Sequence, residues 1–431
     1  MLRTADQILS ERARFSPMLE AIVDLGRDRR FTYLDVEQRS NALAHILRDQ
    51  GVKKGDRVAL LMVNGHSFIE CYYAVAKLGA IAVLLNWRLT VHEMDYIVKD
   101  SGASVLMFTR ELGELASALK DISPTIRLWI EDGEALEAQI AAAPQTRVDC
   151  DKDGDDPLFI MYTSGTTGKP KGAVLTHKAS VAWHQAAIAT SDFRYGERLY
   201  TVAPMFHIGA MAVATLAIHR GMTNIIDHVF EPGRVWQIIA DERIHSTFLV
   251  PAMLNFMAKH EAAWVSGHEA LRGVLCGGSP VPASLIELYA KHGIDIHQVY
   301  GATENHGGLC MISPEDALKK AGSTGKPYIG LDVRIVDKSG RDVAPGVPGE
   351  VITRGDHVLK EYWNKPEETH KAFKDGWFYL GDIAEMDDDG FIYIKDRSKD
   401  MIISGGENVY PAEVEDIILS MDDVLEVAVI G

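Results

Sequence analysis

Short apolar runs alternate with segments of helical periodicity along the first part of the chain. RVALLMVN (57–64) has the length of a strand, SFIECYYAVAKLG (67–79) has helical spacing, and AIAVLLN (80–86) is again strand-like. Strand, helix and strand in this order predict a parallel βαβ unit. A helix is expected to follow Thr90, which forms a capping box with Glu93, and to end at Gly102 before a strand over 104–109.

The same alternation returns between residue 157 and about residue 296, so the pattern predicts two large α/β regions that extend to about residue 322. The expected strands are 158–163, 198–203, 246–251, 272–278 and 294–301, and the expected helices are 179–189, 233–244 and 284–293.

The pattern changes after residue 322 to short alternating runs between turn signals, with DDDG (387–390) as a hairpin. We expect a small β subdomain over 323–395, which completes an N-terminal domain over 1–395. Cations at 396–399 mark a junction, and 400–431 are expected to begin a small α+β domain that is cut short, with a helix at 414–421 and a strand at 424–431. The predicted fold class is therefore α/β, with a small β subdomain and the start of a truncated α+β domain.

Composition narrows the possible partners. The 431 residues include 44 Lys and Arg against 61 Asp and Glu, a formal charge of −17, which argues against a general nucleic-acid binder. The four cysteines form no CxxC pair, which favours a reducing compartment. The first residues lack the continuous apolar core of a secretory signal, and the apolar runs are shorter than the roughly 18 residues of a membrane helix, so we expect a cytoplasmic protein without a transmembrane segment.

The densest chemical signal follows the strand at 158–163. Glycines that free backbone N–H groups, hydroxyl donors and two lysines are the groups that a phosphate cradle needs. Only two residues separate the first glycines, and a proline follows the first lysine, so this is not the P-loop of nucleotide hydrolases. The alternative is a solvated surface loop. The candidate residues are Thr163, Ser164, Gly165, Thr166, Thr167, Gly168, Lys169 and Lys171.

Four further segments hold candidate chemistry, and each also has a plain structural explanation. Glu304, after a strand, is either a solvated charge or a ligand for Mg²⁺ beside a triphosphate. His207 lies in an apolar stretch, where a histidine is more often part of the core than catalytic. The glycines at 277–278 suit a tight turn or the approach of a planar ring. Asp382 is either a surface charge or an acceptor for two hydroxyls of a vicinal diol.

Taken together, YTSGTTGKPKG, PMFH, YGATE, YLGD and KDRSKDMIISGGENVYPAEVE resemble the successive motifs of the adenylate-forming superfamily. This superfamily includes acyl- and aryl-CoA synthetases, and the final segment is most similar to bacterial long-chain fatty-acid and feruloyl-CoA ligases. The resemblance implies activation of a carboxylic acid with ATP and Mg²⁺ to an acyl-adenylate, followed by thioester formation with CoA.

The resemblance also assigns roles to residues. The glycine-rich segment would hold the β- and γ-phosphates, Glu304 the Mg²⁺ ion, and Asp382 and Arg397 the ribose and phosphate region. Lys399 would be a catalytic hinge residue, and residues 405–407 would reach the thioester-forming site. His207 would lie beside the substrate carboxylate. Adenine and acyl contacts are expected from Gly277, Gly278, Ser279, Pro280, Tyr300, Gly301, Ala302 and Thr303, and the acid itself from Trp183, His207, Met211, Gly278, Ala302 and Gly308.

Several alternatives stay open at this point. The adenylating lysine of the superfamily lies near the end of a C-terminal domain, and no counterpart precedes Gly431, so we expect ATP and acid binding but weak adenylation. A fatty acid is favoured slightly over a cinnamate-type aromatic acid. Transfer to a carrier protein is a rival activity, and a nucleotide-binding protein without catalysis is a rival of another class. A homodimer and membrane-surface association stay possible.

Overall fold

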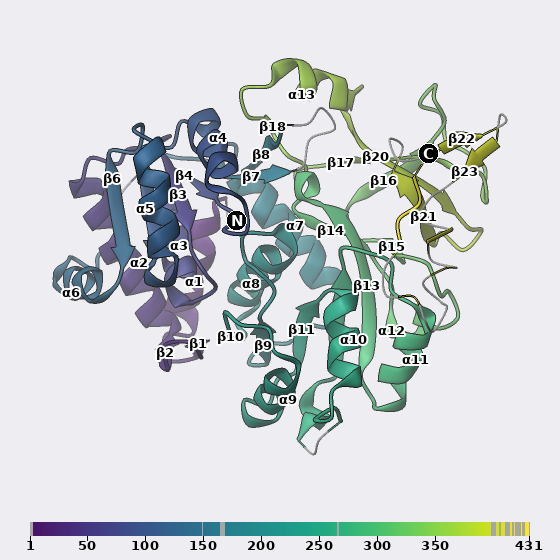
Figure 1. The fold of residues 1–431 in the computed structure, drawn as a ribbon, viewed down its shortest axis with the longest axis horizontal. Coiled ribbons are helices and arrows are strands. Elements are labelled where there is room, and N and C mark those ends of the chain that lie inside the picture. The colour runs from purple at the N-terminus through teal and green to yellow at the C-terminus, as the bar shows by residue number, and fades with distance from the viewer. Residues whose placement is uncertain are drawn as a thin grey trace.

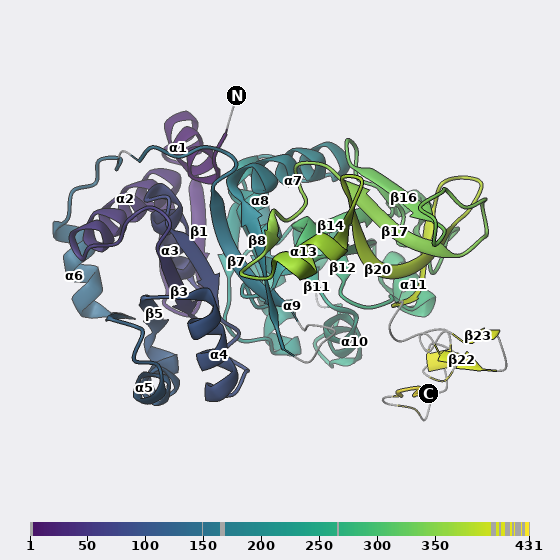
Figure 2. The same cartoon turned by 90° about the horizontal axis from the view of Figure 1, so that it is seen from above.

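The protein is described here from a computed structural model that covers residues 3–148, 150–163, 169–264 and 267–397. Beyond these, it describes residues 402–404, 407–409, 414, 415, 418, 424 and 427–430. Two large mixed sheets lie next to each other, and a smaller antiparallel sheet lies beyond the second (Figures 1 and 2). Among the described residues, no helix has the length and apolar character needed to cross a membrane.

The first sheet has the order β18-β8-β7-β4-β3-β5-β6. The pairs among β7, β4, β3, β5 and β6 are parallel, whereas β7 with β8 and β8 with β18 are antiparallel. The strands are β3 (Arg57–Leu61), β4 (Ile81–Leu84), β5 (Val105–Thr109), β6 (Leu128–Asp132), β7 (Pro157–Thr163), β8 (Lys171–Thr176) and β18 (Glu361–Tyr362). Its helices are α2 (Tyr33–Asp49), α3 (His66–Lys77), α4 (Val91–Ser101), α5 (Gly113–Ile122) and α6 (Glu134–Ala142), with a 3-10 turn η1 (Arg110–Leu112).

The second sheet has the order β15-β14-β13-β12-β11-β9-β10-β1-β2. Its strands are β1 (Glu20–Asp24), β2 (Arg29–Thr32), β9 (Arg198–Thr201), β10 (Thr223–Ile226), β11 (Ser246–Leu249), β12 (Gly273–Gly277), β13 (Asp295–Ala302), β14 (Gly307–Met311) and β15 (Lys326–Pro327). The accompanying helices are α1 (Ala5–Phe15), α7 (His177–Thr190), α8 (Ile208–Arg220), α9 (Pro232–Asp241), α10 (Pro251–Lys259), α11 (Ala283–Lys291) and α12 (Pro314–Ala317), with η2 (His268–Ala270) and η3 (Thr303–Asn305).

The α/β class and the expected helices and strands of both regions are confirmed, including the capping box. Thr90 Oγ1 accepts a hydrogen bond from the Glu93 amide, the Glu93 carboxylate accepts one from the Thr90 amide, and Gly102 ends α4 in the left-handed conformation. The division of the chain is different from the sequence-based interpretation. β7, expected in the second region, pairs with β4 of the first sheet, and β1 pairs with β10 of the second. Periodicity identifies a strand, but its partners are chosen by long-range packing.

The β subdomain holds β16 (Asp332–Val336), β17 (Gly349–Arg354), β19 (Phe373–Lys374), β20 (Trp377–Met386) and β21 (Ile392–Arg397). The predicted hairpin at 387–390 joins β20 to β21. Residues 359–372 leave this sheet: β18 pairs with β8 of the first sheet, and α13 (Pro366–Ala372) follows it.

A short hairpin of β22 (Ile402–Ser404) and β23 (Glu407–Val409) follows. Of the helix expected at 414–421, the described residues Val414, Glu415 and Ile418 are helical and the others lie outside the described residues. The strand expected at 424–431 is wrong at the described residues 424 and 427–430, which form no strand. The apolar pattern of this segment favours a strand, but a strand forms only where another strand pairs with its backbone N–H and C=O groups, and no described strand pairs with these residues.

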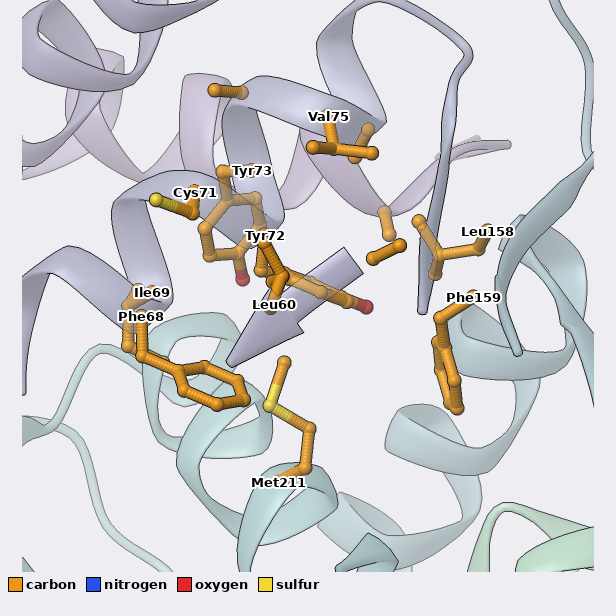
Figure 3. Packing of buried hydrophobic residues seen from close by; sticks show 14 of the residues in the cluster. Leu60, Phe68, Ile69, Cys71, Tyr72, Tyr73, Val75, Leu158, Phe159 and Met211 are labelled. Carbon is orange, nitrogen blue, oxygen red and sulfur yellow. The ribbon is translucent and has the colours of Figure 1, made fainter. Parts of the chain in front are cut away.

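The main core joins the two sheets (Figure 3). Phe68 and Tyr72 of α3 pack in one cluster with Leu60 of β3, Phe159 of β7 and Met211 of α8, and each is at most 1% exposed. Burial of one such side chain contributes roughly 1.5–3 kcal/mol. This shared core holds β3 and β7 of the first sheet against α8 of the second.

Candidate functional site

The glycine-rich segment connects two antiparallel strands. β7 ends at Thr163, directly across from Lys171 at the start of β8. The candidates Ser164, Gly165, Thr166, Thr167 and Gly168 lie outside the described residues. Lys169 is exposed, with its Nζ 5.7 Å from the centre of the Tyr96 ring, and the Tyr96 hydroxyl donates to the carbonyl of Pro170 (3.2 Å). The turn is thus anchored on both sides, by the β7–β8 pairing and by α4.

Glu304 meets the end of β7 although 141 residues separate it from Thr163. It lies in η3, the turn that joins β13 to β14. Its Oε1 accepts hydrogen bonds from Thr163 Oγ1 (3.3 Å) and from the Tyr362 hydroxyl (2.9 Å), and its carbonyl accepts one from the Leu359 amide (2.6 Å). The carboxylate is therefore held at the edge of the first sheet, beside the glycine-rich turn.

The donor set around Glu304 fits a magnesium ion that is shared with phosphates. Among the described residues, none hydrogen-bonds Glu304 Oε2, and no group of three or more His, Cys, Asp or Glu is arranged to hold a metal. Mg²⁺ in nucleotide enzymes typically takes one or two carboxylates and completes its shell with water and phosphate oxygens. One anchored carboxylate with a spare oxygen is sufficient for that pattern.

Asp382 lies at the same edge, in β20 of the β subdomain. Its Oδ2 accepts a hydrogen bond of 2.6 Å from the hydroxyl of Tyr300, which precedes Glu304 by four residues. The backbone of Asp382 pairs with that of Arg397 in β21. The side chain of Arg397 and all of Lys399 lie outside the described residues. The structure thus ties the predicted ribose aspartate to Tyr300, four residues before the predicted metal carboxylate.

The glycines near this edge have packing roles that the sequence did not indicate. A Cβ on Gly301 would lie 1.7 Å from the carbonyl oxygen of Gly307 in β14, and one on Gly277 would lie 2.6 Å from that of Val299 in β13. Only glycine lets these strands approach so closely. Gly278, Ser279 and Pro280 follow β12 as an exposed turn, and Ala302 and Thr303 continue from β13 into η3.

Two of the residues expected around the acid come together, and a third does not. The buried indole of Trp183 donates from Nε1 to the carbonyl of Gly308 (2.6 Å). Met211 belongs instead to the core cluster beside Phe68 of α3 (Figure 3), whereas its neighbour Ala212 packs in the cluster of Trp183. The helix α8 therefore turns Ala212, not Met211, toward Trp183.

His207 is exposed, so the interpretation of this histidine as part of the core is wrong. It precedes α8 as the N-cap residue, because the loop 202–207 carries it out of the apolar segment, and its ring lies 4.6 Å from that of Phe206. Desolvation by neighbouring atoms and the Arg88 guanidinium lower the pKa of His207. The imidazole is therefore neutral at pH 7.

Three side chains near this edge were not predicted from the sequence. Arg88, exposed in the loop after β4, lies over the Trp87 ring at 5.1 Å; its place at the carboxyl end of a parallel strand was the available signal. Tyr362 and Glu368 arrive from the segment that returns from the β subdomain, for which no motif or spacing gave a signal. The Glu368 carboxylate pairs with Lys171 Nζ at 2.6 Å, so the charge of Lys171, expected to face phosphate, is already compensated.

Residues 9–363 match the AMP-binding enzyme family. The chain belongs to this family. It is 44% identical over 428 residues to the long-chain-fatty-acid–CoA ligase FadD13 of Mycobacterium tuberculosis, which covers 98% of this chain and 84% of that protein. It is 40% identical over 422 residues to a feruloyl-CoA synthase of Amycolatopsis sp, covering 97% and 84%.

Solved structures agree with this assignment. The O-succinylbenzoate coenzyme A synthetase MenE of Bacillus subtilis, in complex with ATP and magnesium ion, superposes with a TM-score of 0.88 at 29% identity, covering 99% of this chain and 86% of that one. The AMP-binding family member described here is thus an acyl-CoA synthetase of the adenylate-forming superfamily. It catalyses ATP-dependent adenylation of a carboxylic acid and then thioester formation with CoA.

Proposed function

We propose that the acid activated by this enzyme is a fatty acid and that ATP binds with Mg²⁺ at the edge formed by the β7–β8 turn, η3 and β20. Support comes from the contact of 3.3 Å between Thr163 and Glu304, two residues from segments far apart in the chain. It comes also from the bond of 2.6 Å between Tyr300 and Asp382. These two contacts bring hydroxyl, carboxylate and diol-binding groups to one edge, as a nucleotide with its metal requires.

Each group has one task in this proposal. The backbone N–H groups and hydroxyls of residues 163–168, with Lys169, bind the β- and γ-phosphates. Glu304 holds Mg²⁺, which when bound would offset charge on the phosphates. Asp382 accepts the ribose hydroxyls, with Arg397 near the phosphates. The turn 277–280 and residues 300–303 line the adenine, and neutral His207 donates to the substrate carboxylate.

The reaction then proceeds in two displacements. A carboxylate oxygen of the acid attacks the α-phosphorus of ATP, the bond to the bridging oxygen breaks, and pyrophosphate leaves. The CoA thiolate next attacks the acyl carbonyl, and AMP departs. Fixed donors at the turn act by electrostatic stabilisation, which is the main contribution of a protein to phosphoryl-type transfer. Lys399 serves as the hinge at 396–399 between the domain of residues 1–395 and residues 400–431.

A fatty acid is favoured by the apolar character of α8, in which residues 210–218 are all buried, and by the 44% identity to a long-chain-fatty-acid–CoA ligase. A panel of saturated fatty acids and cinnamate-type acids, tested for acid-dependent pyrophosphate exchange into ATP, measures this choice. We expect fatty acids to give the highest kcat/KM. Exchange restricted to aromatic acids would contradict the substrate, and no exchange with any acid would contradict the site.

One observation favours an aromatic acid as a second candidate. The groups around Gly307 are Trp183, Ala212 and Ile208, which lie 3.4–3.8 Å from the position of a Cβ on that glycine, and the Tyr328 hydroxyl closes against Gly308. A flat ring is well matched to aromatic neighbours of this kind. The same panel separates the two acids.

A further inference from the structure

The segment that leaves the β subdomain at residue 359 forms two hydrogen bonds with Glu304. The Leu359 amide donates to the Glu304 carbonyl at 2.6 Å, and the Tyr362 hydroxyl donates to Glu304 Oε1 at 2.9 Å. No other described segment contacts both the backbone and the carboxylate of Glu304 through hydrogen bonds. We call residues 359–368 the strap.

The strap is itself firmly attached to the first sheet. Within it, β18 pairs with β8 (Tyr362 opposite Ala173), and the Trp363 amide donates to the carbonyl of Gly172 at 2.7 Å. The Trp363 indole donates to the carbonyl of Asp100 at 3.1 Å. The backbone that carries Tyr362 is therefore fixed to the first sheet on both sides of the residue.

The chemistry of the contact is directional. Tyr362 is buried, with 9% exposure, and its phenolic hydroxyl is the donor in the contact with Glu304 Oε1. It occupies Oε1, which also accepts from Thr163, and this leaves Oε2 as the oxygen not bonded by any described residue. A carboxylate with one oxygen fixed presents the other in a defined direction.

We propose that Tyr362 is a positioning residue that orients Glu304 so that Oε2 faces the magnesium ion of bound MgATP. This inference rests on the proposed function of Glu304 as the metal ligand. Groups that orient a ligand in this way typically change metal affinity by about 10–100-fold when they are removed, even though they do not touch the metal.

The ring of Tyr362 also lies close to Lys171. Lys171 Nζ is 5.3 Å from the centre of the ring and pairs with Glu368, at the end of the strap. The strap thereby compensates the charge of Lys171 through Glu368. None of the ion pairs among the described residues involves Glu304, so its Oε2 is available to a metal.

The test compares two matched tyrosines in the full 431-residue chain. Tyr362→Phe removes the hydroxyl that donates to Glu304, and Tyr162→Phe removes the hydroxyl that donates to the Asp100 carboxylate at 2.8 Å, on β7 of the same sheet. Mg²⁺ is titrated in the presence of ATP by calorimetry. We expect Tyr362→Phe to raise the Mg²⁺ concentration at half-saturation by about tenfold, with binding of metal-free ATP unchanged. Tyr162→Phe is expected to stay within about twofold of the parent.

Three outcomes decide the matter, with Glu304→Gln as the reference. A Mg²⁺ titration shifted in Glu304→Gln but not in Tyr362→Phe overturns the role of Tyr362 and leaves the metal site standing. A titration unchanged in Glu304→Gln overturns the metal site itself. If Tyr362→Phe does not fold, Thr163→Val, which removes the longer bond to Oε1 at nearly constant volume, takes its place, and binding of metal-free ATP is measured beside the Mg²⁺ titration because Thr163 is also expected to face the phosphates. A smaller rise in the required Mg²⁺ with metal-free ATP binding unchanged supports positioning through Oε1. No rise, or a rise that only follows a loss of metal-free ATP binding, contradicts it.

Discussion

Two regions of this enzyme contain charged side chains from distant segments. In one region the charges are paired with each other, and in the other some have no protein partner among the described residues. The first, here called the N-terminal ion cluster, consists of Asp24, Arg39, His66, Glu70 and Glu137. His66 Nδ1 lies 2.6 Å from Asp24 Oδ2, and Arg39 pairs with Glu70 at 2.6 Å and with Glu137 at 2.5 Å. The side chains of His66 and Glu70 are each 1% exposed. Every charge in this cluster is compensated by a neighbour, and the cluster joins β1 of the second sheet to α2, α3 and α6 of the first.

The second region is the edge that holds Thr163, Lys169, Glu304 and Asp382. Here two charged groups lack a full set of protein partners among the described residues. Lys169 is exposed and forms no ion pair with any residue in the described ranges, and Glu304 keeps one oxygen without a donor there. Buried charges that satisfy one another make a junction sensitive to the loss of either partner, because a lone buried charge is costly. Charges that lack a protein partner at a sheet edge are available to a ligand. The difference teaches which cluster to assign to stability and which to chemistry.

The largest effect is expected from Glu304→Gln. The amide keeps the volume and the hydrogen bond from Tyr362 but loses the charge that would bind the metal, so kcat for adenylation should fall by about 10³-fold. The urea midpoint should change little. Acid-dependent pyrophosphate exchange and urea unfolding measure the two quantities, and an equal loss of stability and activity would erase the contrast between the two regions.

Glu70→Gln tests the other side of the comparison. The substitution leaves Arg39 in a buried site with an incompletely compensated charge, which typically costs about 3–5 kcal/mol of stability. Exchange activity per folded molecule should be unchanged, since Glu70 lies in α3 and makes no contact with the nucleotide edge. Chemical denaturation gives the stability, and a selective loss of activity in a fully folded variant would count against the division.

The N-terminal ion cluster also predicts a pH dependence. Burial alone would lower the pKa of His66, but the carboxylates of Asp24 and Glu137 outweigh it and raise the pKa to about 9. The unfolded value is about 6.5, so the stabilisation is fully present below pH 6.5 and is lost as the pH rises toward 9; by linkage it amounts to about 3 kcal/mol. Urea midpoints measured from pH 6 to pH 9.5 should fall across this window. His66→Gln should have a flatter profile there, and parallel profiles would refute the assignment to His66.

The smallest effect is expected from Tyr300→Phe. Its hydroxyl orients Asp382 through a bond of 2.6 Å, and one such hydrogen bond to a charged group contributes about 1.5–3 kcal/mol. Other contacts hold Asp382 as well, so we expect only a three- to tenfold rise of KM for ATP, with kcat nearly unchanged. Initial rates at varied ATP measure the split. A fall in kcat without a change in KM would place the role of Tyr300 elsewhere.

Much of the fold and part of the site were open to prediction from the residues alone. The helix after Thr90 and the hairpin at 387–390 follow from local signals, and the motifs around Glu304 and Asp382 indicated nucleotide chemistry. Met211 and Lys171 show where this reasoning stops. Met211 is next to Ala212 in the chain, yet the two side chains pack in different clusters. Lys171 forms an ion pair with Glu368, which is 197 residues away. Neither outcome can be predicted from the residues that are close in sequence.

The amino-acid sequence by itself determined which segments are helices and strands and where the chain turns, and it predicted which motifs suit phosphate and diol chemistry. Each of these depends on neighbours within a few residues, through side-chain alternation, capping and glycine geometry. Tertiary structure decided that β1 joins the second sheet and β7 the first, that His207 is exposed, and that Tyr362 reaches Glu304. These outcomes depend on which distant surfaces bury the most apolar area together, a property of the whole chain and not of any one segment.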